Sequence, residues 1–146
     1  MKERRSSGPL VPILAALVSA FLLKSFVVDL AVVEGSSMLP TFRQGQVVVV
    51  LRAAYGLRMP PGIGGYLFRW SSPRPGQIVV ACNPQSGVDV IKRVQTERRV
   101  AAVSGDMEER VFIVGDNPPE SLDSRDYGEV SVEKIAGRVL LFGQLP

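Results

Sequence analysis

After Val33 the chain consists of short apolar segments rich in valine and isoleucine, and no stretch there has the spacing of a long amphipathic helix. Glycine, proline, asparagine or aspartate bounds each segment, as is typical of strands separated by turns. The predicted strands are Gln46–Arg52, Gln77–Ala81, Val88–Gln95, Val100–Val103, Val111–Val114 and Ile135–Phe142. Short strands at this spacing favour a sandwich or a partly open barrel. We therefore predict a mainly β domain over residues 34–146.

A long loop, Ala53–Gly76, separates the first two predicted strands. Loops of this length usually have a function. This one carries Tyr66, Phe68 and Trp70. These aromatic rings could enter the interfacial layer of a membrane or pack over a sheet edge, and the sequence leaves both alternatives open.

The N-terminal region is apolar. Leu10–Leu23 contains no charged residue, and after Lys24 the apolar run resumes as far as Val33. A helix needs about 20 residues to cross a bilayer. A helix over residues 10–28 would span it, with Lys24 reaching toward a headgroup. We therefore predict a single transmembrane helix over about residues 10–28, within an N-terminal segment of residues 1–33.

Basic residues precede this helix, at Lys2, Arg4 and Arg5. Because basic residues favour the cytoplasmic side of a membrane, we expect a cytoplasmic N-terminus and an extracytoplasmic domain over residues 34–146. A cleaved signal peptide is the main alternative, since it also has a basic start and an apolar core. No convincing pair of small residues for cleavage ends the run before Lys24. A buried core helix is a third alternative, weakened by the lack of an amphipathic stripe.

The chain has no histidine and one cysteine, Cys82. This composition excludes a Ser/His/Asp triad, a Cys/His dyad, an internal disulfide framework and a zinc site built from histidine or cysteine. Any catalysis would depend on Ser, Thr, Lys, Asp, Glu, Tyr or backbone groups, and we expect no metal and no cofactor. Cys82 itself is best interpreted as a small buried apolar residue.

The net charge of +3 is divided between the two parts of the chain. Residues 1–33 hold four basic and two acidic residues, and residues 34–146 hold 13 basic and 12 acidic residues. The β domain therefore has almost no excess charge for phosphate contacts. We expect no nucleic-acid partner.

Three segments carry residues suited to chemistry. The first, Glu34–Thr41 (EGSSMLPT), places Ser36 and Ser37 between a glycine and a proline, close to the predicted membrane helix. A serine in such a turn usually bonds to neighbouring backbone.

The second segment, Val88–Val94, contains a lysine in a predicted strand. In a strand Lys92 shares one face with Val88, Val90 and Val94. Burial among valines would lower the pKa of Lys92, and a neutral amine can act as a general base for a serine hydroxyl. The other three lysines lie in or before the apolar segment or in a polar stretch. The alternative is an edge-strand lysine that deters aggregation.

The third segment, Gly115–Gly128 (GDNPPESLDSRDYG), follows an apolar strand and is dense in polar side chains. It is either a solvated loop or a buried polar network that positions a neighbouring side chain.

EGSSMLPT, VIKRV and GDNPPESLDSR, in this order behind an apolar segment, resemble the three signature boxes of type I signal peptidases. These are membrane-anchored Ser/Lys endopeptidases that remove signal peptides. AAYGLRMP and SPRPGQIVV resemble the segment between the boxes, so the similarity extends to about Phe142. The resemblance implies a signal-peptidase-like β catalytic domain.

The resemblance also implies residue roles. Ser37 corresponds to the nucleophile, Lys92 to the general base and Ser121 to a hydroxyl that orients the lysine. The two supporting ion pairs would be Asp116 with Arg93 and Asp123 with Arg125. Asn117 and Gly35 would be further members of this supporting network. An extended signal peptide would lie as an added strand against Asp89–Ile91 and the stretch before Ser37. Small side chains before the cut would fill pockets lined by Met38, Val90 and Ile91.

The sequence departs from the family pattern at three places. Gly35 stands where some members supply a hydroxyl to the oxyanion hole, which would then depend on backbone N–H groups such as that of Ser37. The usual extension after VIKRV is missing, and Pro118 follows GDN in place of the more usual basic residue. We therefore expect a minimal catalytic core.

The functional prediction is a monomeric, single-pass serine endopeptidase of the cell membrane that cleaves signal peptides from exported precursors. Its expected partners are these precursors and the lipid bilayer. One alternative is a maturation protease of the same fold dedicated to one precursor. Others are a self-cleaving Ser/Lys repressor relative, although no helix-turn-helix precedes the β region, and a non-catalytic membrane-tethered β module.

Overall fold

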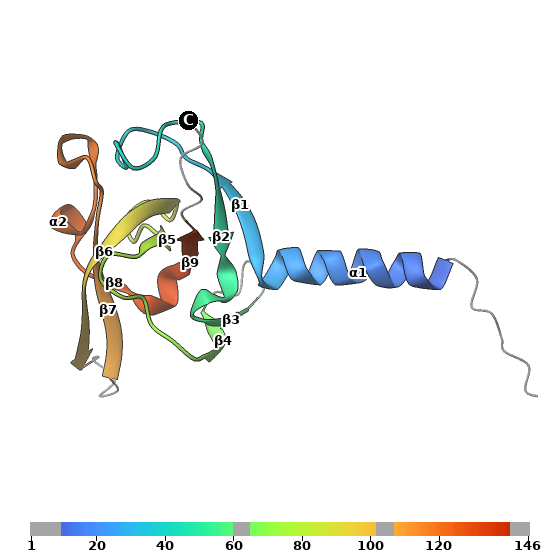
Figure 1. Cartoon of the computed structure of the whole chain (residues 1–146). Coiled ribbons are helices and arrows are strands. Elements are labelled where there is room, and N and C mark those ends of the chain that lie inside the picture. Colours follow the sequence, from blue (N-terminus) through green and yellow to red (C-terminus); the bar gives the residue numbers. More distant parts are fainter. Residues whose placement is uncertain (1–9, 60–64, 102–106, 141–146) are drawn as a thin grey trace, which may run out of the picture.

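The computed structural model describes residues 10–59, 65–101 and 107–140. Figure 1 shows a lone helix that extends away from a curled β-sheet region. The helices are α1 (Leu10–Phe26) and the short α2 (Ser124–Tyr127), with single 3₁₀ turns at Arg52–Ala54, Pro118–Glu120 and Val132–Lys134. The strands are β1 (Val28–Val32), β2 (Val47–Leu51), β3 (Gly56–Arg58), β4 (Tyr66–Arg69), β5 (Ile78–Cys82), β6 (Asp89–Ala101), β7 (Met107–Val114), β8 (Val130–Ser131) and β9 (Ile135–Leu140). The predicted mainly β class is confirmed.

The N-terminal helix ends earlier than the sequence predicts. α1 stops at Phe26, and Val28–Val32 forms a strand that pairs antiparallel with Val47–Leu51. The prediction of a helix through Val28 was therefore wrong at its end. β-branched valines fit the strand once β2 is available as a partner. In the part of the chain that the structure describes, no helix has the combined length and apolar character to cross a membrane. The transmembrane span stays a prediction.

Within the described residues, seven strands form one antiparallel sheet in the order β1-β2-β9-β5-β6-β7-β8. β6 covers two segments that the sequence predicted as separate strands, Val88–Gln95 and Val100–Val103, although Val103 lies outside the described residues. Its first half pairs with β5 and its second half with β7. The register shifts between Val94 and Thr96, which is where a bulge turns a strand toward a new direction. This bend curls the sheet.

Strand β5 lies between two hydrophobic cores, because its alternate side chains point to opposite faces of the sheet. Val79 and Ala81 belong to one core, with Tyr55, Val94, Val111, Ile113, Val130, Val132 and Ile135. Ile78 and Val80 belong to the other, with Val33, Met38, Phe42, Val48, Val50 and Val139. Burial on both faces explains why β5 is apolar throughout. The second core also holds the segment that carries Ser37.

The predicted loop Ala53–Gly76 contains a small hairpin, β3–β4. Tyr66 faces inward, and its hydroxyl donates to the carbonyl of Ile135 at 2.8 Å. Phe68 and Trp70 are exposed, with ring centroids 6.3 Å apart. The loop prediction was therefore incomplete, because strand pairing within it is not visible in its irregular local pattern. In the last predicted strand, residues 141 and 142 lie outside the described residues.

Candidate functional site

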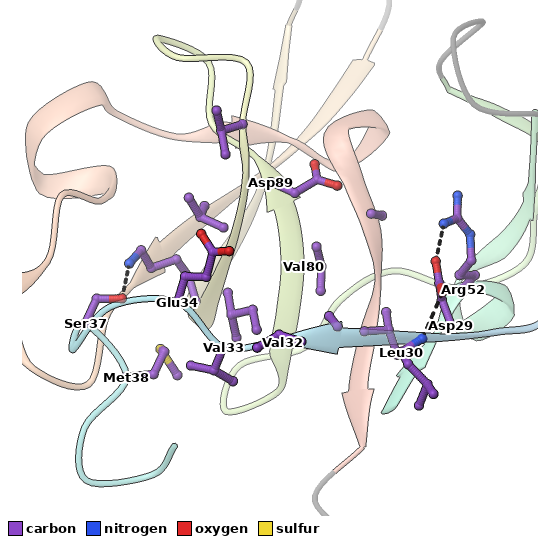
Figure 2. Close-up of a pocket in the computed structure, with 17 residues that line it drawn as sticks. Asp29, Leu30, Val32, Val33, Glu34, Ser37, Met38, Arg52, Val80 and Asp89 are labelled. Carbon is purple, nitrogen blue, oxygen red and sulfur yellow. Dashed lines mark hydrogen bonds and ion pairs between the residues drawn. The ribbon is translucent and has the colours of Figure 1, made fainter. Parts of the chain in front are cut away.

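A groove of about 550 Å³ lies between two walls. One wall is β1 and the segment that follows it, and the other is the beginning of β6. Its floor comes from neighbouring strands, at Val50, Val80 and Ala136. Figure 2 shows Ser37 at one end of the groove and the pair formed by Asp29 and Arg52 at the other. The groove is therefore an elongated channel, lined by both apolar and charged residues, that ends at a serine.

The segment that carries Ser37 is fixed by its apolar neighbours. Met38 and Phe42 are 1% and 3% exposed and lie in the second core. The N–H of Phe42 donates to the carbonyl of Met38 at 2.9 Å, which closes one turn of chain after Ser37. Because both anchors are buried, the Ser37 side chain is held at the groove in a defined position.

Lys92 contacts Ser37 directly. Its Nζ donates to the Oγ of Ser37 at 2.8 Å, a contact drawn as a dashed line in Figure 2. Lys92 is only 3% exposed and lies opposite Val79 in the sheet. Of the valines expected around it, Val94 is buried, but Val88 is 62% exposed and contributes no burial. The structure therefore brings together the serine and the lysine that the sequence singled out.

Burial gives Lys92 an unusual ionisation. Loss of solvent is the largest effect and lowers the pKa of the Lys92 amine below its ordinary value. The carboxylates of Asp123 and Asp116 act in the opposite direction, and the guanidinium of Arg125 lowers the pKa further. The net lowering makes the neutral amine, which can accept a proton, easier to form.

The segment from Gly115 onward packs against the segment that carries Ser36 and Ser37. The backbone N–H of Asn117 donates to the carbonyl of Ser37 at 3.0 Å, and its side-chain Nδ2 donates to the carbonyl of Ser36 at 3.1 Å. Gly115 lies so close to Ser121 and the Ser37 carbonyl that a Cβ at this position would overlap both. These contacts hold the first and third sequence segments together.

Arg93 and Asp116 form a partly buried ion pair beside Lys92 and Ser37. The Nε and Nη2 atoms of Arg93 donate to the two carboxylate oxygens at 2.8 and 2.7 Å. Thr41 donates its hydroxyl to the same carboxylate. Burial raises the pKa of Asp116, but the hydrogen bonds from Arg93 and Thr41 outweigh burial and leave that pKa lowered. The pair links β6 to the segment that begins at Gly115 and, through Thr41, to the chain that follows Ser37.

The Asp123 side chain is fully buried and accepts five hydrogen bonds from three residues, one of them from the backbone N–H of Arg125 at 3.2 Å. The other four donors are the Gly115 N–H at 2.8 Å, the Ser121 hydroxyl at 2.6 Å, and Nε and Nη2 of Arg125 at 2.8 and 2.6 Å. Burial raises the pKa of Asp123, but these hydrogen bonds hold it well below its usual range. Ser121 thus donates to Asp123, and the Ser121–Lys92 hydrogen bond that the resemblance implies is not among those of the described residues.

The expected substrate-contacting residues all line the groove: Met38, Asp89, Val90 and Ile91. Gly35 adopts a positive φ of 77° before the serine. Sequence reasoning missed Glu34, Thr41, Val80 and Ala136, as well as the tight packing at Gly115. Thr41 and Glu34 lie within EGSSMLPT, so their place in this motif could have marked them as site residues. Nothing local marks Val80 and Ala136, because pairing across the sheet brings them to the floor.

No cluster of three or more histidine, cysteine, aspartate or glutamate side chains suited to holding a metal ion occurs among residues 10–59, 65–101 and 107–140.

The chain matches the family described as signal peptidase, peptidase S26, over residues 8–107. It belongs to this family. The matched residues include Ser37 and Lys92, whereas Ser121 and Asp123 lie beyond them. The chain is also 31% identical over 74 residues to Signal peptidase I of Buchnera aphidicola subsp. Schizaphis graminum (strain Sg). That alignment covers 51% of this chain and 23% of the relative, so the chain spans about a quarter of the relative's length.

Proposed function

We propose that this chain is a serine endopeptidase that cleaves N-terminal signal peptides, with Ser37 as nucleophile and Lys92 as general base. The observation that carries the proposal is the 2.8 Å contact between Nζ of buried Lys92 and Oγ of Ser37 at the end of the groove. Membership of the signal peptidase family supports the same reaction class.

The first half of the reaction forms an ester on Ser37. The neutral amine of Lys92 accepts the Ser37 hydroxyl proton while Oγ attacks the carbonyl carbon of the scissile bond. The oxygen of the tetrahedral intermediate takes the negative charge, and the Ser37 N–H is a candidate donor to it. Lys92 then gives its proton to the leaving nitrogen, the C–N bond breaks, and the new amine departs.

The second half releases the signal peptide. Lys92 is neutral again and accepts a proton from a water molecule, whose oxygen attacks the ester carbon. The C–O bond to Ser37 breaks, Oγ recovers a proton from the Lys92 ammonium, and the carboxylic acid product leaves. Lys92 therefore passes on each proton that it accepts within the same half-reaction, and it ends the cycle neutral.

The walls of the groove suit an extended peptide. β1 is an edge strand, and among the described residues Asp89–Lys92 pair with β5 on one side and with no strand on the other. Free backbone donors and acceptors on a strand edge can bind a peptide as an added strand. We propose that precursors bind in this way, with small side chains over Met38, Val90 and Ile91.

We further propose that the catalytic domain works at the cell membrane, attached through the N-terminal segment. The support is the apolar surface of α1, where Leu10, Leu14, Leu17 and Phe21 are each more than 60% exposed. Exposed apolar side chains of this extent mark a surface that is covered in its working environment. The single-pass topology stays part of this proposal.

Cleavage of a precursor by the detergent-solubilised full chain tests the function. Ser37→Ala should abolish cleavage with the fold retained, because the Ser37 side chain is small and only partly buried. Ser36→Ala is the matched control and should retain most of the activity. Cleavage by Ser37→Ala at the wild-type rate would refute Ser37 as the nucleophile.

A further inference from the structure

The groove carries more negative than positive charge, although the chain as a whole has a net charge of +3. Its lining includes three carboxylates, Asp29, Glu34 and Asp89, and two basic residues, Arg52 and Lys92. Lys92 must be neutral to act as a base. In the form that begins the proposed reaction, the groove therefore has a formal charge of −2.

The excess charge is concentrated away from the far end of the groove. At that end, Asp29 is paired with Arg52 at 3.0 Å. None of the ion pairs among the described residues includes Glu34 or Asp89. Both side chains are exposed. Figure 2 shows Glu34 on the segment leading to Ser37 and Asp89 on the facing strand. Two unpaired carboxylates thus stand on opposite walls of the groove.

The floor of the groove is different in character from these walls. Val50, Val80 and Ala136 form an apolar surface in which no side chain is charged. Successive side chains of an extended peptide point in opposite directions. A peptide bound along the groove would therefore place every second side chain on the apolar floor and the others toward the opening, near Glu34 and Asp89.

We infer that the groove selects precursors that carry a lysine or arginine at the positions before the cut that face its opening. This inference rests on the proposed function and adds a charge preference to it. Attraction to Glu34 and Asp89 favours a basic side chain at these positions, and repulsion disfavours an acidic one.

The size of the preference follows from the exposure of both carboxylates. An exposed ion pair changes binding by about 1.5- to 5-fold, so the two together predict a preference for lysine over glutamine of about 2- to 25-fold. The same contact exists in the bound substrate and in the transition state, so the effect should fall on KM rather than on kcat. Salt should weaken it, because both groups are exposed.

A peptide scan tests this inference. Lysine, glutamine or glutamate is placed in turn at each of the four positions before the cut, and kcat/KM is measured with the full chain in neutral detergent. We expect lysine to be preferred at alternate positions only. The Lys/Gln ratio should fall toward 1 in the Glu34→Gln/Asp89→Asn double variant and in about 0.5 M salt. Glu34→Lys should shift the preference toward glutamate.

Glu97→Gln is the matched control, because it makes the same charge change on β6 outside the groove. Its Lys/Gln ratio should equal that of the wild type. Binding of the same peptides to Ser37→Ala, followed by fluorescence anisotropy, measures selection without cleavage. Equal kcat/KM and equal affinity for all three peptides at every position would overturn the inference alone. Failure of the wild type to cleave any peptide would overturn the proposed function, and the anisotropy series would still decide the charge preference.

Discussion

At the residue scale, the proposed reaction depends on how Lys92 loses its charge. The Lys92 side chain is buried, and Lys92 lies opposite Val79 in the sheet. Its Nζ contacts a polar partner, the Oγ of Ser37. Burial lowers the pKa of this amine, whereas Asp123 and Asp116 raise it. The Arg125 guanidinium donates two hydrogen bonds to the carboxylate of Asp123, and its positive charge limits the effect of Asp123 on Lys92.

Lys92→Arg should be as inactive as Lys92→Ala. A guanidinium keeps the positive charge but stays protonated at any workable pH, so it cannot accept the Ser37 proton. Wild-type kcat/KM should rise with pH, because deprotonation creates the active amine. The midpoint should lie below the ordinary lysine value of 10.5 because the pKa is lowered. Measuring kcat/KM against pH for both proteins checks this, and substantial activity of the arginine variant would exclude lysine as the base.

Asp123 should make the fold sensitive to acid. Its pKa is lowered in the folded state, so its contribution to stability is complete above the unfolded value of 3.8 and is lost as pH falls below it. Asp123→Asn should cost about 2 kcal/mol at pH 7, because Arg125 and Ser121 lose an ionised acceptor. As the pH falls from about 4 to about 2, the variant should lose less stability than the wild type. Urea unfolding at several pH values measures both effects.

Asp29→Asn is the control for this experiment, because the Asp29 side chain is 38% exposed in its ion pair with Arg52. Its cost should stay below about 1 kcal/mol at pH 7. Equal costs for the two variants would contradict the role assigned to the buried carboxylate.

At the scale of elements, the site is assembled where β6 changes partners. Arg93 is paired with Ile78 of β5 and with Val114 of β7, and Lys92 immediately precedes it. The end of β7 leads directly into Gly115 and Asp116. One strand junction therefore places the lysine, its neighbouring ion pair and the third sequence segment beside the serine loop.

Gly115→Ala should disrupt this junction. The added Cβ would overlap Ser121 and would lie 2.6 Å from the Ser37 carbonyl oxygen, so the loops must move apart. Overpacking of this kind costs about 1–3 kcal/mol, and the displaced serine should lower kcat by at least about 10-fold. Thermal unfolding and steady-state kinetics measure the two effects.

Gly128→Ala is the matched control for Gly115→Ala. Gly128 has a positive φ of 83° but nothing within 4 Å of an added Cβ. The substitution should cost about 1 kcal/mol through backbone strain and leave kcat unchanged. If Gly115→Ala behaves in the same way, close packing at Gly115 does not position Ser37.

At the scale of the whole molecule, an apolar helix extends away from a β region that holds the groove (Figure 1). If the N-terminus is cytoplasmic, protease added outside spheroplasts should digest the chain after Val33 and protect residues 1–5. Detection with tags at the two ends measures both fates. Protection of both ends would contradict the predicted topology. A mature protein that begins after Lys24 would identify the segment as a cleaved signal peptide.

Much of the site could be predicted because its residue types leave few alternatives. Without histidine, a serine can find a side-chain base only in lysine, tyrosine or a carboxylate, and Lys92 is the lysine that a valine-rich strand buries. The motif resemblance paired Arg93 with Asp116 and Arg125 with Asp123, and both ion pairs are present. For Ser121 the resemblance implied a hydrogen bond to Lys92, whereas its hydroxyl donates to Asp123, because a hydroxyl turns toward the strongest acceptor near it.

The sequence by itself determined the β class, the positions of β2, β5, β7 and β9 and the residues around Ser37 and Lys92, because β-branched runs, turn formers and short motifs act over a few neighbours. Only the tertiary structure decided where α1 ends, since Val28–Val32 suits a helix or a strand until β2 pairs with it. It also decided that β6 is one strand, and that Val80 and Ala136 form a groove floor with Ser37 at its end. These features depend on hydrogen bonds and packing between segments far apart in the chain, which no local pattern encodes.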